Sequence, residues 1–219
     1  MGFIEITGPG YTELLLKRLR GEVPELTWLK QIRNILRPDL SPGVTLLDIG
    51  CGTGYAYNTF REFGVLYTGL DLESQYLRVA EQWFAGVADI KFFQHDITTF
   101  PPPVTAEIVI CSAMLEHCAS LMPSLQNLVD GALRTIVLRT FLGNVEHIYT
   151  ISSPVPHHRE THKKYNNQYS FRDVLGYIEG RGFKTRVYRD EYTDGMPQLV
   201  DGVVRTFYVV CARKQSNGS

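Results

Sequence analysis

Short apolar runs alternate with helical patterns from residue 25 to residue 192. A continuous apolar run that ends in glycine is typical of a strand buried on both faces of a parallel sheet. Apolar residues three and four positions apart are typical of a helix with one buried face. The pattern predicts strands over residues 44–49, 65–70, 90–94, 107–111 and 135–139, and helices over residues 25–37, 55–63, 74–84, 123–131 and 170–180 or 170–182.

The chain closes with two predicted strands, residues 183–192 and 203–212, joined by a loop without a helix. Such a connection permits antiparallel pairing, whereas parallel neighbours need a long crossover. We therefore predict a single α/β domain with a doubly wound seven-stranded sheet, mostly parallel with the last strand antiparallel, and helices on both faces. The predicted parts are an N-terminal helical extension (1–24), a core (25–212) and a flexible tail (213–219).

Residues 141–169 show no strong periodicity and exceed the usual length of a connection, so we expect an insertion that covers the substrate. Residues 157–164 (HHRETHKK) lie within it. Their ordinary interpretation is a solvated polar loop. The functional interpretation is that the loop folds over the site, where His158 acts as a base or the Arg and Lys side chains bind an anion.

Composition and charge narrow the class of protein. The 219 residues carry 22 Lys and Arg against 23 Asp and Glu, a formal charge of −1, which argues against a dedicated nucleic-acid or anionic-membrane binder. The four cysteines form no CxxC pair, so we expect reduced, mostly buried thiols and no metal site. No apolar stretch resembles a secretion signal or a membrane span, and we expect a cytoplasmic protein without membrane contact.

The strongest chemical signal is the segment Asp48–Gly54 (DIGCGTG), between a buried strand and a helix. Its three glycines permit a tight turn and a close approach of the backbone to a ligand. The N–H groups that begin the next helix favour a carboxylate or a phosphate. The dinucleotide pattern GxGxxG requires glycine at position 55, where this chain has Tyr55, so a nicotinamide cofactor is disfavoured.

Two acids follow the next two strands. Asp71 ends the second strand, 17 positions beyond Gly54, where a carboxylate can accept hydrogen bonds from both hydroxyls of a ribose. Its structural alternative is a helix cap or a turn carboxylate. Asp96, after the third strand, can accept from the exocyclic amine of an adenine, or can be an ordinary turn aspartate.

In this order, DIGCGTG (48–54), GLDL (69–72), HDI (95–97) and ICSAMLEH (110–117) resemble the class I S-adenosylmethionine-dependent methyltransferases, over roughly residues 25–212. The resemblance implies a Rossmann-like fold, and S-adenosyl-L-methionine as the methyl donor that becomes S-adenosyl-L-homocysteine. It further implies a cofactor-binding role for each of the following residues. Gly50 and Gly52 would pass beneath the methionine portion, and Asp48 would hold the loop or the amino group. The backbone around Cys111 and Ser112 would face the methionyl end, and Cys51 is a further cofactor-binding residue. Asp71 would bind the ribose, Leu72 would pack on the adenine, and Asp96 with Ile97 would recognise its edge.

Methyl transfer to a hydroxyl benefits from a general base. His117 follows the fourth strand and is the first candidate, with His158 the second; the alternative for His117 is a capping or packing histidine. We expect a small-molecule acceptor, for example a hydroxyl of a sugar or natural product, and no nucleic-acid partner. The alternatives are a nicotinamide-dependent oxidoreductase and a non-catalytic module that binds the same cofactor.

Overall fold

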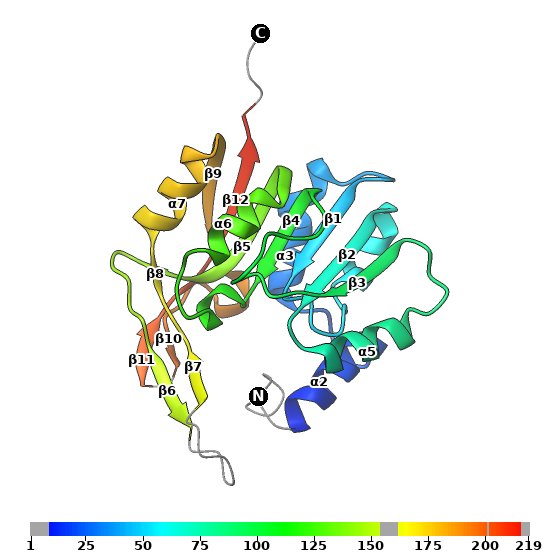
Figure 1. Cartoon of the computed structure of the whole chain (residues 1–219), viewed down its shortest axis with the longest axis horizontal. Helices are drawn as coiled ribbons and strands as arrows, with labels where there is room; N and C mark the ends of the chain where they lie inside the picture. The colour runs from blue at the N-terminus through cyan, green and yellow to red at the C-terminus, as the bar shows by residue number, and fades with distance from the viewer. Residues whose placement is uncertain (1–8, 154–161, 201, 216–219) are drawn as a thin grey trace.

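One long sheet runs through the molecule, with its strands in the order β3-β2-β1-β4-β5-β12-β9 (Figure 1). The structure, a computed structural model, describes residues 9–153, 162–200 and 202–215. Strands β1 to β5 are mutually parallel, and β12 is antiparallel to both of its neighbours. The strands span β1 Thr45–Ile49, β2 Leu66–Asp71, β3 Ile90–Gln94, β4 Ala106–Ser112, β5 Ala132–Gly143, β9 Phe183–Arg189 and β12 Phe207–Lys214. The predicted fold class is thereby confirmed.

Helices cover both faces of this sheet because successive strand residues point to opposite sides. In β4, Val109 and Cys111 pack with helices α6 and α7, whereas Ile108 and Ile110 pack with helices α3 and α4. The helices span α2 Pro9–Arg20, α3 Thr27–Leu36, α4 Tyr57–Phe60, α5 Ser74–Trp83, α6 Ser124–Asp130 and α7 Phe171–Gly180. No helix in the described ranges is both long and apolar enough to span a bilayer.

The predicted helix ends follow local capping chemistry. Ser170 caps α7 by accepting a hydrogen bond from the Asp173 backbone N–H at 3.2 Å, as the sequence predicts. Gly64 closes the helical segment after α4 in the left-handed conformation, with φ +67°. The segment itself is shorter than expected, because α4 gives way to a 3₁₀ turn over Arg61–Phe63.

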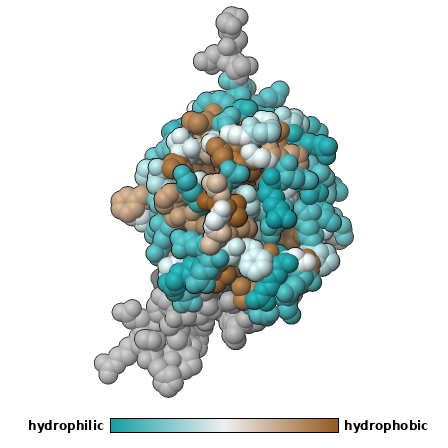
Figure 2. Space-filling model, turned by 90° about the vertical axis from the view of Figure 1, so that its right-hand side faces the viewer, coloured by the Kyte–Doolittle hydropathy of each residue, from teal (hydrophilic) through white to brown (hydrophobic). Residues whose placement is uncertain are grey.

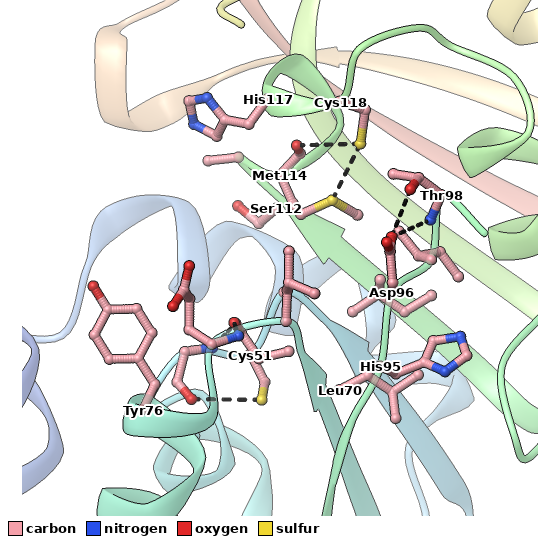
Figure 3. Close-up of a pocket in the computed structure, with 18 of the residues that line it drawn as sticks. Cys51, Leu70, Tyr76, His95, Asp96, Thr98, Ser112, Met114, His117 and Cys118 are labelled. Atoms are coloured by element: carbon pink, nitrogen blue, oxygen red, sulfur yellow. Dashed lines mark hydrogen bonds between the residues drawn. The ribbon is translucent and has the colours of Figure 1, made fainter. Parts of the chain in front are cut away.

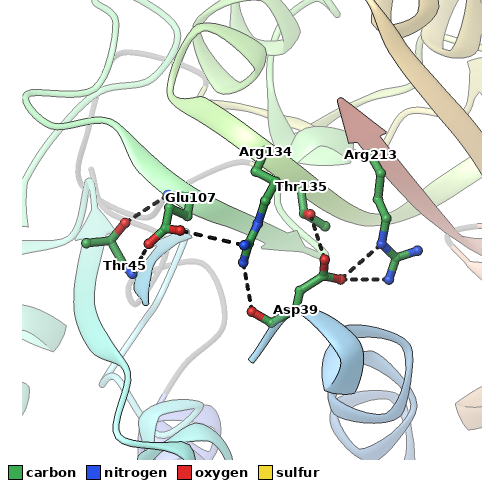
Figure 4. A network of polar contacts seen from close by, with 6 residues as sticks. All are labelled: Asp39, Thr45, Glu107, Arg134, Thr135 and Arg213. Atoms are coloured by element: carbon green, nitrogen blue, oxygen red, sulfur yellow. Dashed lines mark hydrogen bonds and ion pairs between the residues drawn. The ribbon is translucent and has the colours of Figure 1, made fainter. Parts of the chain in front are cut away.

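A polar network joins strands at the edge opposite to their carboxyl ends (Figure 4). Arg213 of β12 binds Asp39 at 2.7 Å, and Arg134 of β5 donates to the Asp39 backbone carbonyl at 2.8 Å. Glu107 and Thr45 exchange hydrogen bonds between β4 and β1, at 3.2 and 2.8 Å. Because β12 is antiparallel, its carboxyl end meets the amino ends of the parallel strands here.

A buried ion pair ties β5 to the segment after β9. The Arg139 guanidinium donates to both carboxylate oxygens of Asp190, at 2.7 and 3.1 Å. The guanidinium also lies 3.9 Å from the Phe207 ring centroid and 5.5 Å from that of Trp28 in α3. Gln31 adds a second link from α3, because its amide donates to the Arg189 carbonyl at 2.7 Å.

Two hairpins extend from the same end of the sheet (Figure 1). One consists of β6 Thr150–Ser153 and β7 His162–Tyr165, and the other of β10 Gln198–Val200 and β11 Val203–Arg205. A short strand, β8 Tyr169–Ser170, pairs with the end of β5. The predicted insertion over residues 141–169 thus contains, in its described part, the end of β5, the β6–β7 hairpin and β8, and its role as a substrate cover stays a prediction.

Some predicted boundaries of strands and helices are wrong. The strand predicted over 203–212 divides into β11 and β12, and β12 reaches Lys214, so residues 213 and 214 are sheet rather than tail. The helix predicted over 25–37 begins at Thr27, and Pro38 lies inside a 3₁₀ turn that follows Leu36. Hydrophobic periodicity does not resolve these ends because tertiary contacts set them.

We expect Arg139→Met to lower the free energy of unfolding by about 3–5 kcal/mol, because it leaves the Asp190 carboxylate buried without its counter-ion. Urea unfolding at neutral pH measures this. The matched control is Arg20→Met at the exposed Arg20–Glu22 pair, 3.7 Å apart, which we expect to cost under about 1 kcal/mol. Equal losses in the two variants would contradict a structural role for the buried pair.

Candidate functional site

A cavity of about 550 Å³ opens at the carboxyl ends of β1, β2 and β4 and is closed on one side by α2. This is the edge where doubly wound sheets bind their ligands. Figure 3 shows side chains reaching it from the bend after β1, from the end of β4 and from the segment after β3. Its lining includes these residues predicted from the sequence: Gly50, Cys51, Gly52, Asp71, Leu72, Asp96, Ile97, Ser112 and His117.

The bend after β1 forms the floor of the cavity. Gly50 has φ +81°, and a Cβ built on it would lie 2.8 Å from Met114 Cγ, so only glycine fits this position. The Gly50 and Cys51 N–H groups both donate to the Leu70 carbonyl, at 2.8 and 3.0 Å. Strand β2 thereby holds the bend in place.

Asp71 joins this bend to the end of β2. Its carboxylate accepts from the Gly52 N–H at 2.8 Å and from the Glu73 N–H at 2.9 Å. Burial raises the pKa of Asp71 above its usual value, although these two hydrogen bonds act in the opposite direction. Asp71 can therefore hold this turn and still accept hydrogen bonds from a ligand in the cavity, because each carboxylate oxygen has more than one lone pair.

Asp96 lies across the cavity, in the segment after β3. Thr98 donates to its carboxylate through the backbone N–H at 2.9 Å and through the hydroxyl at 2.6 Å, and the Thr99 hydroxyl adds a third bond at 3.1 Å. Burial alone would raise the pKa of Asp96, but these hydrogen bonds outweigh it and the pKa is lowered. A fixed, ionised acceptor therefore faces the cavity.

Asp48 does not line the cavity and lies beneath the bend. The Tyr67 hydroxyl donates to its carboxylate at 2.5 Å, and the side chain is buried. Burial is the main cause that raises the pKa of Asp48 to about 7; the Tyr67 hydrogen bond lowers the pKa, and the nearby Asp71 charge adds to the increase. Asp48 is thus placed to support the bend from below rather than to touch a ligand.

The end of β4 supplies a polar atom to the cavity. Ser112 Oγ is buried and has no hydrogen-bond partner within the described part of the chain. Cys111, one position earlier, is fully buried and does not line the cavity. A buried hydroxyl without a partner costs free energy, so Ser112 favours a ligand that hydrogen-bonds here.

His117 lies in the 3₁₀ turn after β4 and lines the cavity. Its Nδ1 lies 3.0 Å from the Tyr165 backbone carbonyl, which can only accept a hydrogen bond. The neutral ring therefore carries its proton on Nδ1, and the lone pair is on Nε2. The other predicted base, His158, lies outside the described residues.

Helices α2 and α3 contribute residues to the cavity that no sequence pattern indicates. Leu15 and Arg18 of α2 and Trp28 of α3 line the cavity. The Arg18 guanidinium lies 5.6 Å from the Tyr55 ring centroid, and the Asn58 side chain donates to the Leu19 carbonyl at 3.0 Å. The apolar spacing predicts helices here, but only the fold places them over the cavity.

The glycine bend, the acid that ends β2 and the acid after β3 define a class of α/β proteins that bind an adenosyl compound at the sheet edge. Residues 46–135 match the family model described as a methyltransferase domain. The chain thus contains a segment similar to methyltransferase domains, within a fold that it shares with solved S-adenosylmethionine-dependent methyltransferases.

Curated relatives match over part of their length. A malonyl-[acyl-carrier protein] O-methyltransferase from Serratia marcescens is 39% identical over 88 residues, which are 40% of this chain and 33% of that protein. A ubiquinone biosynthesis O-methyltransferase from Paraburkholderia xenovorans is 36% identical over 78 residues, 34% of each chain. The matched part of the chain thus spans about a third of these relatives.

Solved structures share the fold across most of the chain. A TehB-like methyltransferase from Corynebacterium glutamicum has a TM-score of 0.62 at 18% identity, covering 95% of this chain and 100% of that one. Magnesium protoporphyrin IX methyltransferase from Synechocystis PCC 6803, solved with bound SAM, has a TM-score of 0.59 at 16% identity, with 95% and 92% covered. At this identity the likeness concerns the fold.

The raised pKa of Asp48 predicts a pH-dependent stability. Between about pH 4, its value in the unfolded chain, and about pH 7, the folded protein holds a proton that the unfolded chain has lost. The contribution of Asp48 to the free energy of unfolding is therefore fully present below pH 4, and it falls by about 4 kcal/mol as the pH rises to 7.

Asp48→Asn tests this prediction, because the uncharged amide does not titrate but its oxygen can still accept the hydrogen bond from the Tyr67 hydroxyl. Urea unfolding at pH 5, 6, 7 and 8 should show a flatter pH dependence in the variant and a higher stability at pH 8. Asp89→Asn, at an exposed aspartate, is the control and should follow the unmodified protein. Parallel curves for all three proteins would contradict the prediction.

Proposed function

We propose that this protein transfers a methyl group from S-adenosyl-L-methionine to a hydroxyl of a small-molecule acceptor. The observation that carries the proposal is the hydrogen bond between Gly52 N–H and Asp71, which fixes a glycine bend and a carboxylate in one cavity with Asp96. The two O-methyltransferases named above support oxygen as the accepting atom. When bound, the cofactor supplies an electrophilic methyl carbon on a sulfonium.

The residues present fit this cofactor. Asp71 keeps lone pairs for ribose hydroxyls after its two backbone contacts, and Asp96 faces the position expected for the adenine edge. Leu72, 58% exposed in the free protein, offers an apolar surface for the adenine ring. Ser112 Oγ and the glycine bend would receive the methionyl end.

Helix α2 would close the methionyl end of the site. Leu15 Cδ1 lies 3.9 Å from a Cβ built on Gly52, so α2 packs directly over the bend. Arg18 Nε is buried and has no hydrogen-bond partner among the described residues. A carboxylate can accept hydrogen bonds from such a guanidinium and balance its charge, so we assign Arg18 to the carboxylate of the cofactor.

The protein contributes positioning and a base to the reaction. Holding the acceptor oxygen about 3 Å from the methyl carbon, in line with the bond that breaks, supplies much of the rate. We propose His117 as the general base, since its Nε2 lone pair can take the hydroxyl proton while Tyr165 holds the ring. His158 stays a second candidate.

The β6–β7 hairpin is the proposed cover of the acceptor. Asn167, after β7, donates to the Cys118 carbonyl at 2.8 Å and accepts from the Tyr149 N–H at 2.9 Å. Together with the contact between Tyr165 and His117, these bonds anchor the hairpin to the turn after β4. The cytoplasm is the proposed compartment, because all four cysteines are free and buried.

Asp71→Asn should weaken binding of S-adenosylmethionine roughly 10- to 150-fold, because a charged acceptor of a ribose hydroxyl is worth about 1.5–3 kcal/mol. Isothermal titration measures the affinity, with Asp89→Asn as a charge-matched control far from the cavity. NAD should not bind either protein. Unchanged affinity in Asp71→Asn, or saturable binding of NAD, would overturn the assignment.

His117→Ala should slow turnover by about 10²- to 10⁴-fold and leave the affinity for the cofactor within about twofold. S-adenosylhomocysteine formation, with a set of hydroxyl compounds as acceptors, measures the rate. His158→Ala is made in parallel, and the slower variant identifies the base. Wild-type rates in both would show that positioning alone suffices. Cofactor binding without product from any acceptor would favour the non-catalytic alternative.

A further inference from the structure

We propose that Asn167 is a positioning residue for the base, which keeps the ring proton of His117 on Nδ1 and the lone pair on Nε2. This inference rests on the proposed role of His117 in methyl transfer and goes beyond it. Asn167 does not line the cavity, so it acts only through the turn after β4 that carries His117. Residues 165–169 contact this turn through several hydrogen bonds.

One backbone carbonyl locates the proton of the His117 ring. The Tyr165 oxygen lies 3.0 Å from Nδ1 and can accept a hydrogen bond but cannot donate one. In a neutral imidazole, the hydrogen bond made by one ring nitrogen decides which nitrogen carries the proton. With the carbonyl displaced, the ring could carry its proton on Nε2, where it could not take up the proton of an acceptor hydroxyl. The base therefore depends on where Tyr165 lies relative to the turn.

The Asn167 side chain holds Tyr165 in this place. It is fully buried, and its amide group donates to the Cys118 carbonyl at 2.8 Å and to the Tyr169 hydroxyl at 3.2 Å. Its oxygen accepts from the Tyr149 N–H at 2.9 Å. Cys118 directly follows His117, and Tyr149 directly precedes β6. One amide group thus joins the turn that carries the base to both ends of the β6–β7 hairpin.

The backbone on the other side of His117 is held by the same short segment. The Asn167 N–H donates to the Glu116 carbonyl at 2.8 Å, and the Tyr169 hydroxyl donates to the Leu115 carbonyl at 2.9 Å. The carbonyls of the two residues before His117 and of the residue after it are therefore all bonded to residues 167 and 169. Because these three residues are buried, water does not easily replace the bonds.

The contacts of the Asn167 side chain require both halves of an amide. An aspartate has the same shape but no N–H group, so a carboxylate oxygen would face the Cys118 carbonyl oxygen. An alanine would leave that carbonyl and the Tyr149 N–H without this partner. A side chain that only fills space would need neither the donor nor the acceptor.

The direct test determines the tautomer of His117 by ¹⁵N NMR, because the protonated and unprotonated nitrogens of an imidazole differ in chemical shift. Spectra are recorded on the full chain without ligand at about pH 8, where imidazole rings are mostly neutral. The chain has six histidines, and the His117 signals are those that disappear in His117→Ala. We expect the proton on Nδ1 in the unmodified protein and a populated Nε2–H form in Asn167→Ala and Asn167→Asp.

Gln31→Ala is the matched control. Gln31 is also a buried amide, which donates to the Arg189 carbonyl at 2.7 Å and accepts from the Glu191 N–H at 3.0 Å, but it does not line the cavity. This variant loses the same kinds of bond and should keep the proton of His117 on Nδ1.

Tyr169→Phe is a milder second variant, for use if the Asn167 variants do not fold. It removes the hydroxyl that donates to the Leu115 carbonyl and should change the tautomer of His117 in the same direction. An unchanged tautomer in every folded variant of Asn167 and Tyr169, or the same change in Gln31→Ala, would overturn the inference.

A kinetic arm tests whether Asn167 acts through His117. Asn167→Ala should lower kcat for S-adenosylhomocysteine formation about 10- to 100-fold, with the KM for the cofactor within about twofold, and should cause no further loss in His117→Ala. Additive losses in the double variant, or a wild-type kcat in Asn167→Ala, would overturn the inference. If the unmodified protein turns over no acceptor, the proposed methyl transfer fails, and the tautomer measurement still decides the role of Asn167.

Discussion

The hydrogen bond from the Gly52 N–H to Asp71 joins the bend after β1 to the end of β2. The floor of the cavity depends on this connection, since the same bend places its other two N–H groups on the Leu70 carbonyl. Three contacts between neighbouring parallel strands thus set the path of a glycine-rich segment that has little conformational preference of its own. Position in the sheet, rather than the loop sequence alone, makes the segment a binding surface.

Below this bend, the structure retains a costly group. Asp48 is buried and accepts a hydrogen bond from the Tyr67 hydroxyl, and its pKa is raised to about 7. A cationic ligand above the bend would favour the charged form of Asp48. In the proposed function, this side chain therefore couples stability to cofactor binding although it does not line the cavity.

The part of the cavity lining that Trp28 contributes depends on a different kind of contact. Arg139, Asp190, Trp28 and Phe207 come from four different segments, and the Arg139 guanidinium packs against both rings while it is paired with Asp190. The bend after β1, Asp71 and Asp96, in contrast, lie at or directly after the ends of β1, β2 and β3.

The sequence by itself determined the sheet, the order of its elements along the chain and most of the predicted site residues that line the cavity, because strand periodicity, capping at Ser170 and glycine spacing act locally. It left open whether Asp48 holds the loop or a ligand group, and it did not indicate Leu15, Arg18 or Trp28, because a local pattern does not show that a helix will cover a distant bend. Only the tertiary structure decided these, together with the hairpin in residues 141–169, because they depend on which surfaces meet after the sheet has formed.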